Sequence, residues 1–171
     1  MEGKMREQLT KGDIKKIKAE IEHRKVVVRK EALEAVKEAR AHGDLSENFE
    51  YHAAKKDKNQ NESRIRYLER MLRTAVVISE DSRADEVGIN DTVQVYIEED
   101  DELETYRLVT SIRGNSMAGL VSVESPIGKA LMGHKVLERV SVKVNQEYSY
   151  DLIIKAIFKT GEDEEDCIRK F

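Results

Sequence analysis

The sequence contains little cysteine and few aromatic residues. Its one cysteine, Cys167, excludes a disulfide within the chain and a cysteine-based metal cluster. Aromatic residues make up 5% of the 171 residues, tryptophan is absent, and 37% of the residues are charged. A single compact core usually needs more large apolar side chains than this. The composition therefore predicts an extended helical element joined to a small globular domain.

Long apolar runs are also missing from the sequence. No stretch is apolar for long enough to form a signal peptide or a membrane-spanning helix, so we expect a cytoplasmic protein with no membrane partner. The four histidines show none of the spacings typical of a metal-dependent hydrolase, which argues against an enzyme that acts alone. These histidines are His23, His42, His52 and His134.

Charges of opposite sign are concentrated in different parts of the chain. The net charge is −4, but residues 1–75 carry 19 basic and 14 acidic side chains, whereas residues 76–171 carry 11 basic and 20 acidic ones. Two interpretations are open. Either the first part meets an acidic surface or nucleic acid and the second a basic surface, or long solvent-exposed helices are simply rich in lysine and glutamate.

Two long helices are predicted before residue 76. Residues 11–42 lack glycine and proline after Gly12, and their apolar residues follow a helical spacing up to Gly43, a residue typical of a helix end. Residues 47–74 also lack glycine and proline, and their expected core positions follow a heptad pattern. Because only a few residues join the helices, residues 1–76 predict an antiparallel coiled-coil hairpin about 40 Å long. The expected core positions are Ile14, Ile17, Ile21, Val28, Ala32, Ala35 and Ala39 in the first helix, and Tyr51, Ala54, Lys58, Asn61, Ile65, Leu68, Leu72 and Ala75 in the second.

After residue 76 the pattern changes to strands. Short runs of β-forming residues alternate with turn signals, and Pro126 marks the start of a short helix. Residues 77–160 therefore predict a small antiparallel β domain with one helix, and residues 161–171 an acidic tail. The fold class is α+β. The expected strands cover residues 76–78, 92–97, 105–110, 119–123, 140–144 and 148–154.

The tip of the hairpin, GDLSEN at residues 43–48, carries two carboxylates, Asp44 and Glu47. One interpretation is a capping box, with Asp44 as N-cap and Glu47 reaching back to it, or with Ser46 as the cap of a helix that starts later. The other is a metal site, because each carboxylate can give an oxygen to Mg²⁺, which prefers six oxygen ligands. Two acids alone bind Mg²⁺ weakly, so the remaining ligands would come from a partner.

Two motifs resemble those of a known protein family. Residues 39–55, ARAHGDLSENFEYHAAK, closely resemble the signature of the bacterial transcript-cleavage factors, the GreA/GreB family. Residues 121–135, VSVESPIGKALMGHK, are similar to a segment of the family's C-terminal domain. The resemblance covers about residues 5–158. For the fold, it implies an antiparallel coiled coil followed by an FKBP-like β domain.

For the function, the resemblance implies an accessory factor of bacterial RNA polymerase and not an enzyme in its own right. Members of the family rescue polymerase that has slid backward on DNA: the hairpin enters the secondary channel, and the polymerase cleaves its own transcript near the 3′ end. By position, Asp44 and Glu47 are the acids that help to hold the second catalytic Mg²⁺ and to orient the attacking water. Two alternatives are a channel-occupying regulator without cleavage activity and a structural coiled coil whose tip acids only cap. We expect a monomer.

The resemblance also assigns supporting residues near the tip. Ser46 and Asn48 belong to the loop that faces the polymerase. Arg40 and Lys55 match a basic patch that meets the 3′ end of the nascent RNA, since attraction to phosphate needs no sequence readout; the alternative is ordinary solvent-exposed helix charge. Phe49 either stacks on a base or packs against the first helix, and packing is expected.

A second contact with the polymerase is implied in the β domain. The family meets a coiled coil at the rim of the polymerase channel, and the matching residues are Glu124, Ser125, Pro126 and Ile127. The alternative is that Ser125 and Pro126 only turn the chain into a short helix.

Overall fold

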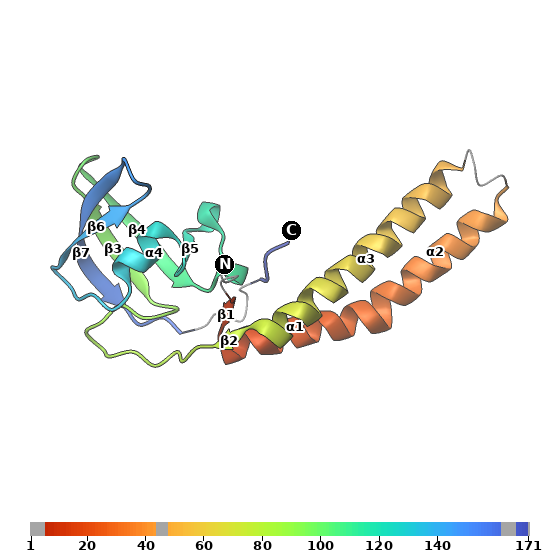
Figure 1. The fold of residues 1–171 in the computed structure, drawn as a ribbon, viewed down its shortest axis with the longest axis horizontal. Helices are drawn as coiled ribbons and strands as arrows, with labels where there is room; N and C mark the ends of the chain where they lie inside the picture. The colour runs from red at the N-terminus through yellow and green to blue at the C-terminus, as the bar shows by residue number, and fades with distance from the viewer. Residues whose placement is uncertain (1–5, 44–47, 162–166, 171) are drawn as a thin grey trace. The chain divides into compact units, whose positions relative to one another are not determined.

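The structure, a computed structural model, describes residues 6–43, 48–161 and 167–170 (Figure 1). The chain divides into a hairpin unit, which holds Ile14–Ala75, and a sheet unit, which holds Gln8–Asp13 and the chain from Val76 onward. The acidic run predicted at the start of the tail falls largely on residues 162–166, which lie outside the described residues.

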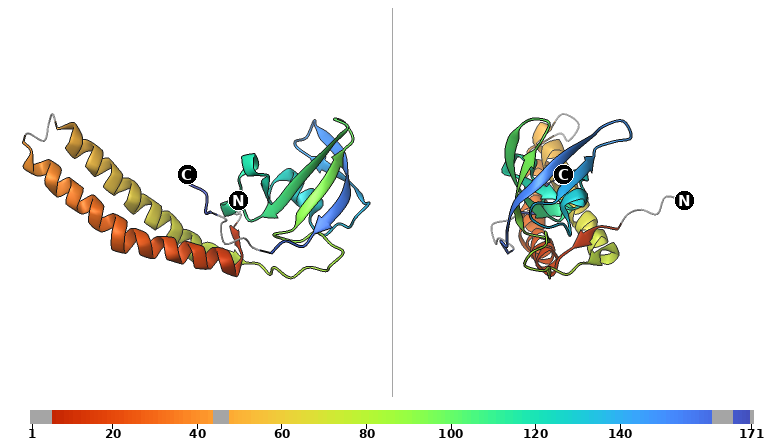
Figure 2. Two further views of the ribbon diagram at one scale, coloured as in Figure 1. Left: turned by 180° about the vertical axis from the view of Figure 1, so that it is seen from behind. Right: turned by 90° about the vertical axis from the view of Figure 1, so that its left-hand side faces the viewer.

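The hairpin unit consists of two antiparallel legs that lie side by side (Figures 1 and 2). The first leg runs without a break through α1 (Lys11–His23), a π-helical turn at Arg24–Val28, and α2 (Arg29–Ala41). The second leg is a single helix, α3 (Phe49–Thr74). The prediction of a helical hairpin is therefore confirmed.

The π-helical turn changes which residues of the first leg are buried. A π-turn holds one more residue than an α-turn, so a spacing that assumes α-helix throughout no longer holds beyond Val28. Val36 is buried and Ala35 is exposed, so the prediction of Ala35 as a core residue is wrong. Ala39 remains buried as predicted. The turn contains three consecutive valines, whose β-branched side chains are crowded in an α-helix.

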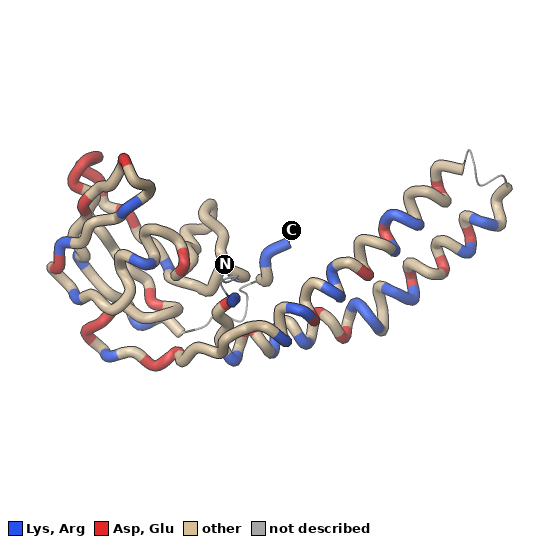
Figure 3. Tube along the Cα trace, viewed as in Figure 1, with Lys and Arg blue, Asp and Glu red and all other residues tan. Residues whose placement is uncertain are grey.

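The middle of the hairpin unit is held by polar contacts. Asn61 and Arg64 of α3 are both buried. Asn61 Nδ2 donates to the main-chain oxygen of Arg24 at 3.2 Å, and Asn61 Oδ1 accepts from Arg24 Nη1 at 3.1 Å. Arg64 Nε donates to Glu20 Oε1 at 2.9 Å. Further from the seam, basic and acidic residues are interleaved along both legs (Figure 3), which favours the interpretation of most of these charges as solvent-exposed helix charge.

A five-stranded sheet forms the centre of the sheet unit, with the strand order β5–β4–β3–β7–β6. The helix α4 (Pro126–Leu131) contacts β5 and β6 (Figure 2). Neighbouring strands are antiparallel except β4 and β5, which are parallel, so the prediction of an antiparallel β domain is confirmed with one parallel pair at the sheet edge. The strands are β3 (Thr92–Ile97), β4 (Glu102–Val109), β5 (Leu120–Ser122), β6 (Arg139–Lys143) and β7 (Ser149–Phe158).

Alternating side chains of the strands build one apolar core. In β3 the buried positions are Val93, Val95 and Ile97, every second residue, as the two-residue period of a strand requires. Gly128 in α4 lies so close to the sheet that an added Cβ would stand 2.0 Å from the main-chain oxygen of Ser122. This glycine therefore lets α4 pack directly against the end of β5.

The N-terminal segment of the sheet unit was not predicted from the sequence. The strand β1 (Gln8–Leu9) pairs in parallel with β2 (Val76–Val77), almost seventy residues further along the chain. Next to β1, Thr10 and Asp13 form a reciprocal capping box, in which each main-chain N–H donates to the other's side chain at 3.0 to 3.1 Å.

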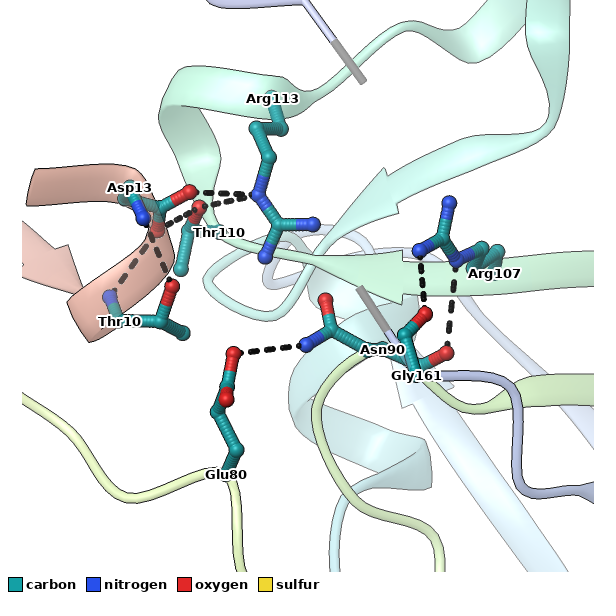
Figure 4. A network of polar contacts seen from close by, with 8 residues as sticks. All are labelled: Thr10, Asp13, Glu80, Asn90, Arg107, Thr110, Arg113 and Gly161. Carbon is teal, nitrogen blue, oxygen red and sulfur yellow. Dashed lines mark hydrogen bonds and ion pairs between the residues drawn. The ribbon is translucent and has the colours of Figure 1, made fainter. Parts of the chain in front are cut away.

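Asp13 also belongs to a buried polar cluster (Figure 4). Arg113 Nε donates to Asp13 Oδ1 at 2.6 Å, and Thr110 Oγ1 donates to Asp13 Oδ2 at 2.6 Å. The side chains of Asp13 and Arg113 are fully buried. Within the sheet unit, this cluster fixes Asp13 to the loop that follows β4.

Candidate functional site

The first candidate site is the tip of the hairpin unit. On one side of the tip, α2 ends at Ala41. Gly43 follows with a φ of 128°, a backbone conformation that residues other than glycine rarely adopt. On the other side, the described chain resumes at Asn48. The predicted site residues Asp44, Ser46 and Glu47 lie outside the described residues.

Asn48 joins the two legs directly below the tip. It is the N-cap of α3, where its Oδ1 accepts from the main-chain N–H of Tyr51 at 3.0 Å. Its Nδ2 donates to the main-chain oxygen of Ala39 in α2 at 2.7 Å. The Asn48 side chain therefore pairs with a main-chain N–H at the start of α3 and with a main-chain oxygen near the end of α2, groups that helix ends leave without helical partners.

The position of Asn48 corrects the capping interpretation of the tip. Because α3 begins at Phe49 with Asn48 as N-cap, the prediction of a cap at Asp44 or Ser46 is wrong. Asparagine, aspartate and serine are about equally favoured at this position, and the sequence offers all three within five residues. Local preference could not choose among them, whereas the contact with Ala39 is made by Asn48.

Arg40 and Tyr51 form a second link between the legs below the tip. The Arg40 Cζ lies 5.6 Å from the centre of the Tyr51 ring. A hydrogen bond from Arg40 lowers the pKa of the Tyr51 hydroxyl, and the positive charge of Lys55 acts in the same direction. The two predicted RNA-contacting residues, Arg40 and Lys55, thus approach the same tyrosine from the two legs. Both are solvent-exposed.

Phe49 is the most exposed aromatic side chain near the tip. At the first position of α3 it is 87% exposed, so the prediction that it packs against the first helix is wrong. The reason is its place in the helix: the N-cap Asn48 points across the hairpin, and Phe49 follows it on a different face. Phe49 and the two cations therefore offer an aromatic face and positive charge to an approaching molecule.

The second candidate site is the turn from β5 into α4. Ser125 is the N-cap of α4, where its Oγ accepts from the N–H of Gly128 at 3.1 Å and donates to the Ser122 oxygen at 2.6 Å. Pro126 occupies the first helical position and is exposed. Glu124 accepts a hydrogen bond from the Ser111 hydroxyl, and Ile127 packs against the core. The turn is thus built as the capping alternative predicted, and it presents Pro126 to solvent.

Neither site has the side chains of a self-contained metal centre in the part of the chain that the structure describes. No three histidine, cysteine, aspartate or glutamate side chains gather there as a metal-binding group. Across the same residues, no helix is both long and apolar enough to cross a membrane.

Both sites lie in regions of the chain that match known family models. A family model described as transcription elongation factor, N-terminal, matches residues 7–77, and one described as transcription elongation factor, GreA/GreB, C-term, matches residues 81–159. The chain belongs to the GreA/GreB family. The tip lies within the first match and the β5–α4 turn within the second. The resemblance drawn from the two sequence motifs is therefore confirmed.

Individual GreA relatives agree with the family match. The chain is 49% identical over 138 residues to transcription elongation factor GreA of Chloroherpeton thalassium, which covers 80% of this chain and 87% of the relative. It is 48% identical over 137 residues to GreA of Caldanaerobacter subterraneus, with the same coverage. A solved structure of the transcription factor Gfh1 aligns with 89% of this chain and 97% of that chain at 26% identity and a TM-score of 0.44.

Proposed function

We propose that this GreA/GreB family member stimulates bacterial RNA polymerase to cleave its own transcript when the enzyme has moved backward on its template. The observation that carries the proposal is the GDLSEN tip at the end of a helical hairpin. With 26 residues at 1.5 Å each, α3 is about 39 Å long, enough to carry the tip deep into a channel.

The tip acids are the proposed working groups. Asn48 caps α3, so neither Asp44 nor Ser46 is needed as the N-cap of this helix, which supports the role of the acids as ligands. Two carboxylates can supply only part of the six oxygen ligands that Mg²⁺ prefers, so they fit an ion that the polymerase also holds. An Mg²⁺ ion held by Asp44 and Glu47 together with the polymerase would supply polarisation of the scissile phosphate and a lower pKa of its bound water.

The residues below the tip have supporting roles in this proposal. Asn48 fixes the spacing of the two legs, so that Asp44 and Glu47 enter the partner's site from a rigid base. Arg40 and Lys55 attract the phosphates of the nascent RNA near its 3′ end. Phe49, with its exposed ring, stacks on an unpaired base. Ser46 contacts the polymerase within the channel.

The sheet unit supplies the second contact in this proposal. The β5–α4 turn at Glu124, Ser125, Pro126 and Ile127 docks on the coiled coil at the rim of the polymerase channel. Because the chain brings only ligands and position, cleavage takes place in the polymerase active site and the chain alone is not an enzyme. We propose that it works as a cytoplasmic monomer.

The test is RNA cleavage by purified polymerase that has been backtracked on a template with labelled RNA and Mg²⁺. Wild-type protein is expected to release short fragments from the 3′ end. The Asp44→Asn/Glu47→Gln variant should bind polymerase normally and release about 100-fold fewer fragments, since neutral amides are poor ligands for Mg²⁺.

A control variant separates metal ligation from a general loss of negative charge. Glu31→Gln/Glu34→Gln makes the same charge change at two exposed positions of α2 and should cleave like wild type. Polymerase binding without cleavage by the wild-type protein would reject the proposal in favour of a channel-occupying regulator.

A further inference from the structure

The described end of the chain forms a short strap, Cys167–Lys170, beyond the family's C-terminal match at residue 159. The main-chain N–H of Arg169 donates to the main-chain oxygen of Ile112 at 2.6 Å. Ile168 is half-buried, whereas the other three strap residues are exposed. The strap is therefore attached to the sheet unit at a defined point, the 3-10 turn Ser111–Arg113 that follows β4.

The strap forms one side of a groove on the sheet unit. The groove has a volume of about 1120 Å³, and its lining includes all four strap residues, the turn between β4 and β5, and the β5–α4 turn at Glu124 and Ser125. Met117, at the bend between β4 and β5, also lines the groove and is 99% exposed. The strap thus faces the same space as the proposed polymerase contact.

The dimensions of the groove suit a helix. One turn of an α-helix about 10 Å wide and 5.4 Å long occupies roughly 400 Å³, so the groove has room for about two to three turns. Its walls combine apolar side chains, including Met117, Val121 and Ile168, with charges of opposite sign. Arg169 and Lys170 stand on the strap wall, and Arg113 and Glu124 line the rest of the groove.

We infer that the strap is an added wall of the polymerase-docking surface, and that the groove receives an α-helix of the polymerase with acidic side chains turned toward Arg169 and Lys170. This inference rests on the proposed function. A protein helix fits better than RNA, because the apolar lining needs an apolar partner. The relatives' shared domain, which ends before the strap, would bind through the β5–α4 turn alone.

The first experiment measures the affinity of the full-length chain for core RNA polymerase without nucleic acid. Lys170→Glu is expected to weaken binding about 3- to 10-fold at low salt, and the difference should shrink as salt screens the charges. The matched control is Lys143→Glu, the same charge change at an exposed residue of β6, the opposite edge of the sheet from β5. This control should bind like wild type.

A second pair of variants tests the attachment of the strap. Arg169→Pro removes the N–H that donates to Ile112, whereas Arg169→Ala removes the same side chain and keeps the N–H. The proline variant should therefore bind polymerase about 3-fold more weakly than the alanine variant, because its strap no longer holds the groove wall in place.

Several results would overturn the inference. Equal affinities of Lys170→Glu and Lys143→Glu would show that the strap does not face the partner, and tighter binding by Lys170→Glu or by Arg169→Pro would show that the strap obstructs it. An effect of Lys170→Glu that appears only with nascent RNA present would assign the groove to RNA. If wild type binds and stimulates cleavage while the strap variants are unchanged, only this inference fails. If wild type does not bind polymerase, the proposed function fails and the inference falls with it.

Discussion

The hairpin unit and the sheet unit place their polar side chains differently. In the hairpin unit, Asn61, Arg64 and Glu20 lie in the seam between the two legs. In the sheet unit, the buried polar residues, which include Asp13, Asp91 and Arg113, lie in turns and at element ends, outside the apolar cluster. Helices that meet along a smooth apolar seam can slide, so polar contacts help to set their register. In a sheet, the alternation of buried and exposed side chains and the turns set the register.

The largest expected effect comes from breaking the buried ion pair of the sheet unit. Arg113→Ala leaves the Asp13 carboxylate buried without its charge partner, so we expect the free energy of unfolding to fall by about 3–5 kcal/mol. Urea unfolding followed by circular dichroism measures this change.

An exposed ion pair of the same unit provides the control for Arg113. Arg139, 61% exposed in its side chain, pairs with Glu98 and Asp151 on the surface. Arg139→Ala should cost far less stability than Arg113→Ala, because water solvates the remaining carboxylates. Similar losses for the two arginine variants would mean that burial does not distinguish these pairs.

A smaller effect is expected from the polar seam of the hairpin unit. Asn61→Ala removes two hydrogen bonds to Arg24 and leaves a partly buried main-chain oxygen without its donor, which should cost about 1–3 kcal/mol. Asn59→Ala makes the same change at an exposed position two residues away in α3 and should stay within about 0.5 kcal/mol of wild type. A thermal or urea midpoint that is equally unchanged in both variants would argue that the seam is set by its apolar residues.

The smallest expected effect is a pH dependence of the hairpin unit. Burial alone would raise the pKa of Glu20, but hydrogen bonds from Arg64 and Arg24 outweigh it and hold that pKa below its ordinary value. A carboxyl whose pKa is lower in the folded state stabilises the fold above its unfolded pKa, near pH 4.3, and loses that contribution as the pH falls through its folded pKa.

The measurement compares Glu20→Gln with wild type between pH 7 and pH 3. The variant should be less stable by about 1 kcal/mol at pH 7, and the difference should disappear at the acidic end. Glu22→Gln, at an exposed position of α1, should show no such convergence. A constant difference for Glu20→Gln at every pH would contradict the assigned ion pairs.

Local patterns predicted most of the elements of this fold. The strand β3 was expected at residues 92–97 and is found there, because alternating apolar residues are read directly from neighbouring positions. The motif at residues 39–55 likewise predicted the family from contiguous residues, whereas the role of the tip acids stays a prediction. Contacts between distant residues were missed: the pairing of β1 with β2, and the cluster of Asp13 and Arg113, depend on residues 68 to 100 positions apart.

Two wrong predictions concern the N-cap of α3 and one core position in α2, where several neighbouring residues suit the same role. The tip offers three residues suited to cap a helix, and only the cross-contact with Ala39 shows why Asn48 takes this position. In the first leg, the helical spacing placed Ala35 in the core because it assumed α-helix throughout. The spacing of apolar residues does not show where a π-helical turn adds one residue to a helix.

The π-helical turn is also a place where the first leg can lose one residue and still keep its buried positions. Loss of one codon within Arg24–Val28 would turn that segment into ordinary α-helix and leave Val36 and Ala39 buried. The same deletion within α2 would rotate every later side chain of that leg by about 100°. Insertions and deletions in relatives are therefore expected to collect at this turn, while the length from there to the tip is conserved.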